Sequence, residues 1–238
     1  MNRAENERIF SKEKDPVFKM VVFDMEGVLI NPSGSSTWGV VFDKLGIIDE
    51  HKRLRERFKS GEFSGYMNWS DEACKVLKAY GLTRGKFAEI IDSQQLITGV
   101  REAIQDLREQ GYKTAIITGS FTALAQRIQK ELGINDAIAH CDLKFDNQGK
   151  LDSWELFRVD FGGKVDALSQ IASKYNIAPS ESIFVGDGLN DIPVFRKAGY
   201  SIAFNYIVQD VGDAANAQVK GNDLRLILPI IKNAASKN

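Results

Sequence analysis

Short apolar runs alternate with amphipathic segments along most of the chain, and this alternation constrains the fold more than any other feature. The runs at 18–24, 113–119, 136–140, 182–187 and 200–204 are short and apolar, and several are rich in β-branched residues, as in buried strands. The segments between them have helical periodicity, often with a glycine just past the end. Strands that alternate with helices predict an α/β fold, a Rossmann-like doubly wound parallel sheet covered on both faces.

The details of this pattern give further expectations. Helices are predicted at 101–111, 120–133, 164–175, 191–199 and 223–232, with Ser120 as an N-cap. Pro229 lies inside the last of these and is expected to kink or end it. The polar turn "NQG" within 144–156 indicates a hairpin.

One stretch interrupts the alternation. Residues 35–97 contain no buried-strand run and have a helical pattern throughout. We therefore expect a helical cap at 35–97, inserted into an α/β core made of 18–34 and 98–238, with a solvated lead-in at 1–17. The insertion leaves the core directly after the first strand.

Composition gives no support for several classes of partner. The 31 basic and 32 acidic side chains give a net charge of -1, which does not favour a nucleic-acid or membrane partner. Two cysteines without metal-type spacing suit a reducing cytoplasm rather than a disulfide framework. The first residues are charged with both signs and lack the apolar region of a secretory signal. We expect a cytoplasmic protein; its oligomeric state is left open.

Acidic residues follow two of the predicted strands. Asp24 and Glu26, in "DMEG", follow the first strand, and Asp187 and Asp191, in "GDGLND", follow a later one. Each motif alone is common as a capping turn, but ligand sites in parallel sheets form where the carboxyl ends of strands meet. Carboxylates gathered there require a cation, and oxygen ligands favour a hard divalent ion, Mg²⁺ above all.

Asp24 and Glu26 are two residues apart, so an extended chain projects both carboxylates to the same side. One can attack as a nucleophile while the other transfers a proton. Gly27 leaves room for close approach to a bound group.

Other groups in the predicted crevice suit an anionic substrate. Lys164, in "FGGKVDAL", lies in the first turn of a predicted helix and can neutralise a phosphate or a carboxylate nucleophile. Thr118 lies beside the N–H groups of Gly119 and Ser120, which make an anion cradle at a predicted helix start. With Mg²⁺ and two acids, this set predicts phosphoryl transfer.

The motifs "DMEGVL", "ITGS", Lys164 and "GDGLND" occur in this order. They resemble the four motifs of the haloacid dehalogenase (HAD) superfamily of aspartate-nucleophile phosphatases. The stretch "VGDGLNDIPVFRKAG" and the helix after "ITGS" look closest to the phosphoserine phosphatase-like branch, which carries a helical cap after the first motif. The resemblance implies a HAD-type core and a phosphomonoesterase that hydrolyses a small phosphorylated metabolite.

The resemblance also implies catalytic and metal-binding roles. Asp24 attacks phosphorus and becomes an aspartyl-phosphate, and Glu26 protonates the leaving alcohol and then activates water. Mg²⁺ is held by Asp24, the main-chain oxygen of Glu26, and Asp187, with Asp191 direct or through water.

The phosphoryl oxygens, by the same resemblance, are held by Thr118, the Gly119 N–H and Lys164, while Asn190 completes the phosphate site. One residue departs from the family pattern, because Glu26 stands where the family usually has aspartate. The carboxyl group is kept, but its reach changes by one methylene, and catalysis depends steeply on such geometry.

Substrate choice is the second departure. Phosphoserine-specific members have a glutamate shortly after the first motif and a cap arginine, whereas 31–40 contains no acid and 68–77 contains no arginine. Phosphoserine is therefore not favoured. The cap aromatics are expected to form its own small core, and the basic run at 51–57 a solvated helix face. Any aromatic residue that faces the crevice would indicate a flatter or more apolar leaving group.

Two alternatives stay open at this point. A phosphotransferase or mutase uses the same aspartyl-phosphate with an acceptor other than water. A non-catalytic member binds a phosphorylated ligand without turnover, which only the unusual Glu26 supports. Nicotinamide and P-loop chemistry are disfavoured because the chain has neither a G-x-G-x-x-G after a strand nor a Walker-type loop.

Overall fold

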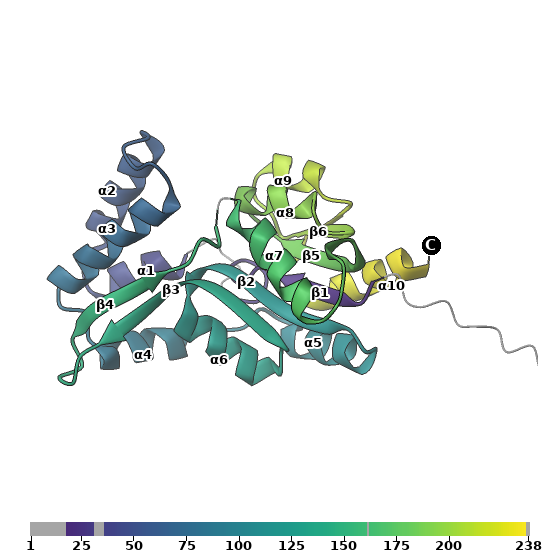
Figure 1. Cartoon of the computed structure of the whole chain (residues 1–238), viewed down its shortest axis with the longest axis horizontal. Coiled ribbons are helices and arrows are strands. Elements are labelled where there is room, and N and C mark those ends of the chain that lie inside the picture. The colour runs from purple at the N-terminus through teal and green to yellow at the C-terminus, as the bar shows by residue number, and fades with distance from the viewer. Residues whose placement is uncertain (1–17, 31–35, 161, 237–238) are drawn as a thin grey trace, which may run out of the picture.

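The computed structural model describes residues 18–30, 36–160 and 162–236, which form a seven-stranded sheet and the helices around it (Figure 1). The strand order is β4-β3-β2-β1-β5-β6-β7, and every neighbouring pair is parallel except β3 and β4. The strands are β1 (Met20–Phe23), β2 (Lys113–Phe121), β3 (Asp136–Phe145), β4 (Leu151–Leu156), β5 (Ser182–Gly186), β6 (Tyr200–Phe204) and β7 (Ala217–Val219).

The two faces of the sheet belong to two apolar cores, as period-two strands require. In β1, Val21 and Phe23 pack into one core, while Met20 and Val22 pack into the other. Figure 1 shows α5 and α6 on one side of the sheet and α7 and α8 on the other. The doubly wound α/β prediction is confirmed. The helices of this part are α5 (Val100–Glu109), α6 (Thr122–Leu132), α7 (Gly163–Lys174), α8 (Ile192–Phe195), α9 (Gln209–Ala214) and α10 (Leu228–Ser236).

Four further helices are inserted between β1 and α5: α1 (Thr37–Lys44), α2 (Ile48–Lys59), α3 (Tyr66–Ala79) and α4 (Arg84–Ser93). The far end of the insertion returns to its beginning, because the Ile97 N–H donates to the Leu29 carbonyl at 2.9 Å. All four helices lie within the predicted cap range of 35–97, and the boundaries themselves stay a prediction. The predicted lead-in at 1–17 and residues 31–35 lie outside the described residues.

The inserted helices also pack on the β3–β4 hairpin. The Trp154 indole on β4 donates to Asp71 of α3 at 2.9 Å. The two cysteines, distant in sequence, meet here: the Sγ atoms of Cys74 on α3 and Cys141 on β3 are 3.7 Å apart, and both thiols are buried and free. This hairpin confirms the one predicted within 144–156, although β3 begins earlier.

The structure corrects several local predictions. Ser120 is not a helix N-cap, because β2 continues to Phe121 through a register shift and α6 begins at Thr122. Pro229 neither kinks nor ends its helix; a 3₁₀ turn at Leu224–Ile227 precedes it, and α10 begins at Leu228 with the proline in its first turn. There its missing N–H breaks no helical hydrogen bond.

Two short elements, β7 and α9, were not predicted. Within the described ranges, none of the helices has the length and apolar character needed to cross a bilayer.

Candidate active site

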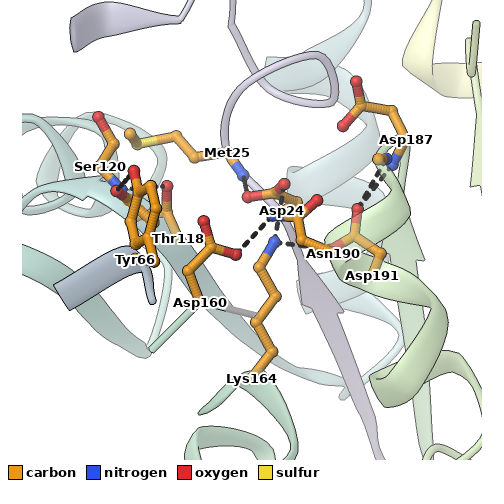
Figure 2. Close-up of polar contacts among 12 residues, drawn as sticks. Asp24, Met25, Tyr66, Thr118, Ser120, Asp160, Lys164, Asp187, Asn190 and Asp191 are labelled. Atoms are coloured by element: carbon orange, nitrogen blue, oxygen red, sulfur yellow. Dashed lines mark hydrogen bonds and ion pairs between the residues drawn. The ribbon is translucent and has the colours of Figure 1, made fainter. Parts of the chain in front are cut away.

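Strand β1 lies between β2 and β5. The strands β2, β3 and β4 are added on one side of β1 and the strands β5, β6 and β7 on the other, so the direction in which the sheet grows reverses at β1. In open α/β sheets ligands bind at such a switch point, outside the carboxyl ends of the strands. The structure places Asp24 and Asp187 directly after β1 and β5, and Thr118 within β2 near its carboxyl end (Figure 2).

The Asp24 carboxylate is held from two sides. Its Oδ1 accepts the Met25 N–H at 2.7 Å, and its Oδ2 lies 2.9 Å from the Lys164 ammonium. Only 6% of the residue is exposed. Burial raises the pKa of Asp24 to about 7, even though Lys164 favours the ionised form. A carboxylate fixed in this way would lose little orientational freedom on reacting.

Lys164 lies in the first turn of α7 and is completely buried. Its Nζ contacts Asp191 Oδ1 at 2.6 Å as well as Asp24, and Figure 2 shows the side chain reaching both acids from below. Burial disfavours the ammonium, but the charges of Asp191 and Asp24 outweigh it and raise the pKa of Lys164. The lysine is therefore a fixed positive charge beneath the Asp24 carboxylate.

The carboxylates of Asp24, Asp187 and Asp191 offer oxygen atoms that all lie within 4.8 Å of one another. Burial raises the pKa of Asp187 to about 9, with further contributions from the charges of Asp24 and Asp191. Such an all-oxygen cluster fits a hard divalent cation. Asp191 is already engaged, because its Oδ2 accepts the N–H groups of Asp187 and Gly188 at 3.0 and 2.9 Å.

Glu26 extends from the same loop toward the inserted helices. Its Oε1 accepts the Thr37 N–H at 2.8 Å, at the first residue of α1. An anion is stabilised at a helix N-terminus, where amide groups lack helical partners. Burial raises the pKa of Glu26 and outweighs the hydrogen bonds with Thr37, which lower it, so the side chain favours the protonated form.

The phosphate-binding candidates on β2 differ from the predicted arrangement. The Ser120 N–H donates to Thr118 Oγ1 at 3.2 Å within a strand, so it is not part of a cradle at a helix start. The Gly119 carbonyl accepts from the Tyr66 hydroxyl and the Trp38 indole, at 3.0 and 3.3 Å.

Asp160 is a site residue that the sequence reasoning missed. Its Oδ1 accepts a hydrogen bond from the Asn190 side-chain amide at 2.6 Å (Figure 2). Its Oδ2 lies 2.3 Å from the position that a β-carbon on Gly119 would occupy. The sequence feature that points to Asp160 is its position four residues before Lys164, in "DFGGK".

A cavity of about 610 Å³ opens above these groups. Six of the eight predicted site residues line it, while Lys164 and Asp191 lie beneath; the six are Asp24, Glu26, Thr118, Gly119, Asp187 and Asn190. The cap aromatics do not only form their own core, because Trp38, Phe58, Tyr66 and Trp69 also line this cavity. The basic run at 51–57 is likewise not wholly a solvated face, since Arg55 lines it too.

The fold and the site define a doubly wound α/β protein with an acidic, lysine-supported centre under a helical insertion. A family model for haloacid dehalogenase-like hydrolases matches residues 18–199. The chain belongs to this family.

Curated relatives lie in the phosphoserine phosphatase-like branch. A phosphoserine phosphatase of Archaeoglobus fulgidus is 32% identical over 213 residues, which cover 87% of this chain and 57% of that protein. A phosphoserine phosphatase of Methanocaldococcus jannaschii is 29% identical over 220 residues, which cover 90% of this chain and 98% of the relative. The predicted branch and the predicted enzyme class, a phosphatase, are confirmed.

The solved structures agree. One described as a phospho-aspartyl intermediate analogue of phosphoserine phosphatase superposes with a TM-score of 0.76 and 28% identity, over 90% of this chain and 98% of the other. The likeness includes the inserted helices, because it covers nearly the whole chain. The prediction of a HAD-type core with an insertion after the first strand is therefore confirmed.

Proposed function

We propose that this chain is a Mg²⁺-dependent phosphomonoesterase that hydrolyses a small phosphorylated metabolite through an aspartyl-phosphate on Asp24. The observation that carries this proposal is the buried Asp24 carboxylate, fixed by Met25 and Lys164 and accompanied by two further acids within 4.8 Å. The likeness to a phospho-aspartyl analogue of phosphoserine phosphatase supports it.

In the proposed reaction, an Asp24 oxygen attacks phosphorus as the bond between phosphorus and the ester oxygen breaks. Glu26 gives its proton to the departing alcohol. It then removes a proton from water, which attacks the phosphorus of the aspartyl-phosphate and releases inorganic phosphate and Asp24. The raised pKa of Glu26 supports its part as the initial proton donor.

The metal is proposed to lie among Asp24, Asp187 and the main-chain oxygen of Glu26, where it would neutralise charge on the phosphoryl oxygens. Asp191 is proposed to act through water, since both of its oxygens accept from protein donors. Asp191 thereby positions Lys164 and the loop after β5.

The phosphoryl oxygens are proposed to bind Thr118, the Gly119 N–H, Lys164 and Asn190. Asn190 currently donates to Asp160, which fixes the direction of its amide. We propose Asp160 as a residue that positions Asn190. The free, buried thiols also support a reducing, cytoplasmic setting.

The test is phosphate release from para-nitrophenyl phosphate and a panel of alkyl phosphates, with Mg²⁺ or with chelator. Wild type should turn over only with the metal, and Asp24→Asn should lose at least about a thousandfold in kcat because the nucleophile is gone. Trapping of a phosphorylated chain in wild type but not in the variant separates hydrolysis through Asp24 from direct attack by water. Full activity in Asp24→Asn contradicts the proposal.

A further inference from the structure

Four aromatic side chains of the inserted helices form one side of the cavity: Trp38, Phe58, Tyr66 and Trp69, here called the aromatic wall. Tyr66 and Trp69 are stacked with ring centroids 5.2 Å apart, and Trp38 meets Trp69 edge-on at 5.3 Å. Phe58 meets Tyr66 edge-on at 6.3 Å and is only partly buried. The wall is thus a continuous packed surface.

The aromatic wall is hydrogen-bonded to Gly119, a residue of the proposed phosphate site. Trp38 and Tyr66 both donate to the carbonyl of Gly119, whose N–H is proposed to bind phosphate. In Figure 2 the Tyr66 ring lies beside Thr118 and Ser120, within the same group of side chains as Asp24. An ester whose phosphorus is at Asp24 must therefore place its leaving group close to this wall.

The core side of the cavity mouth is also apolar. Leu189, Ile207 and Val208 line it and are 53%, 80% and 42% exposed. Apolar side chains gathered in the mouth of a cavity indicate a ligand with apolar surface. A flat group would lie between them and the aromatic wall.

The core contributes the acidic residues that line the cavity, and the inserted helices contribute basic ones. Its acidic lining residues are Asp24, Glu26, Asp160 and Asp187, all from the core, whereas α2 contributes Arg55 and Lys59. Neighbouring Arg53 and Arg57 pair with Glu50 and Glu62 at 2.7 Å. Among the residues that the structure describes, Arg55 has no carboxylate within 4.0 Å, so its guanidinium is available at the mouth.

We propose that the substrate is the phosphate monoester of an aromatic alcohol that carries a second negative group, such as a carboxylate. Its ring lies on the aromatic wall, and its anionic group meets Arg55. This inference rests on the proposed phosphatase function. Phosphoserine also carries a carboxylate for Arg55, but it has no ring for the aromatic wall, and the basic side chains of α2 repel its ammonium group.

The test compares four esters of primary alcohols, which have similar leaving groups: meta-carboxybenzyl phosphate, benzyl phosphate, phosphoserine and glycerol phosphate. Contact with the wall should make kcat/KM for benzyl phosphate about fivefold to tenfold higher than for glycerol phosphate. The carboxylate should add about threefold through Arg55. A higher kcat/KM for phosphoserine than for meta-carboxybenzyl phosphate would overturn the inference.

Variants assign the two contributions. Phe58→Ala should lower the ratio of kcat/KM for benzyl phosphate to that for glycerol phosphate about fivefold, mainly by raising KM for benzyl phosphate. Arg55→Gln should lower kcat/KM more for meta-carboxybenzyl phosphate than for benzyl phosphate, so that the gain from the carboxylate disappears, whereas Arg53→Gln, on the same helix but away from the cavity, should change neither. Equal effects of Arg55→Gln on both benzyl esters would contradict the role of Arg55.

Binding separates this inference from the proposed function. The methylene phosphonates of meta-carboxybenzyl phosphate and of phosphoserine cannot be hydrolysed, so their affinities are measured by calorimetry whether or not the chain turns over. Absence of hydrolysis with tighter binding of the aromatic phosphonate contradicts the phosphatase proposal and keeps the ligand class. Hydrolysis together with tighter binding of the serine phosphonate supports the phosphatase proposal and contradicts the ligand class.

Discussion

Gly27 has a backbone φ of +81°, and Asp187 Oδ2 lies 2.0 Å from where a β-carbon at this position would be. Glycine is thus required twice, for the left-handed backbone and for the approach of the carboxylate. The sequence predicted that the space beside Gly27 would admit a bound group, but in the structure the Asp187 carboxylate occupies this space. The glycine sets the distance between the loop after β1 and the acid after β5.

Gly27→Ala should therefore damage the acidic cluster more than the fold. The added methyl group must displace Asp187, so Mg²⁺ affinity should fall by about tenfold or more. Isothermal calorimetry with Mg²⁺ measures this directly. Gly61→Ala is the matched control, because Gly61 has a φ of +79° with nothing within 4 Å of its β-carbon position. If both variants bind Mg²⁺ as wild type does, the contact with Asp187 has no role.

At the scale of elements, Glu26 joins the loop after β1 to the first inserted helix. Its Oε1 accepts the Thr37 N–H at the start of α1, so a side chain that lines the acidic cavity also contacts the inserted helices. An aspartate is one methylene shorter, so from the same backbone position its carboxylate would extend less far toward the Thr37 N–H. The length of Glu26 therefore matters for its contact with α1.

Two substitutions separate the two roles of Glu26. Glu26→Gln keeps an oxygen that can accept from Thr37 but cannot transfer a proton, so kcat should fall by about a hundredfold or more with little change in Tm. Glu26→Asp keeps the acid but loses the helix contact, which should cost about 1 kcal/mol of stability. Steady-state kinetics and thermal unfolding measure both. A Gln variant as active as wild type would exclude Glu26 as the acid.

For the whole molecule, the sequence predicted what depends on local pattern. Asp24 and Asp187 follow buried strands, so parallel pairing alone brings them together. Asp160 was missed because its approach to Gly119 depends on how the loop after β4 crosses the sheet. Ser120 was misassigned because a register shift carries β2 to Phe121 where local glycine and serine indicated a helix start. The helical spacing of the cap aromatics predicted a buried face but not that this face also lines the cavity.

The acidic cluster makes the stability of the whole chain depend on pH and metal together. Burial raises the pKa of Asp24 to about 7 and that of Asp187 to about 9. An unfolded aspartate has a pKa of about 3.9, so the metal-free folded state binds more protons than the unfolded state between these values. Its stability should therefore fall as pH rises from about 4 to 9.

A divalent cation binds only the ionised carboxylates and offsets their repulsion, so it should stabilise the chain more at high pH than at low pH. At fixed Mg²⁺, the rise in Tm over a chelated sample should be larger at pH 9 than at pH 6 by on the order of 5 °C. Calorimetric scans at both pH values measure it, with Asp187→Asn as the variant that should lose the difference. Equal shifts at both pH values would mean that Asp24 and Asp187 are already ionised without metal, because only their retained protons make the binding of the cation depend on pH.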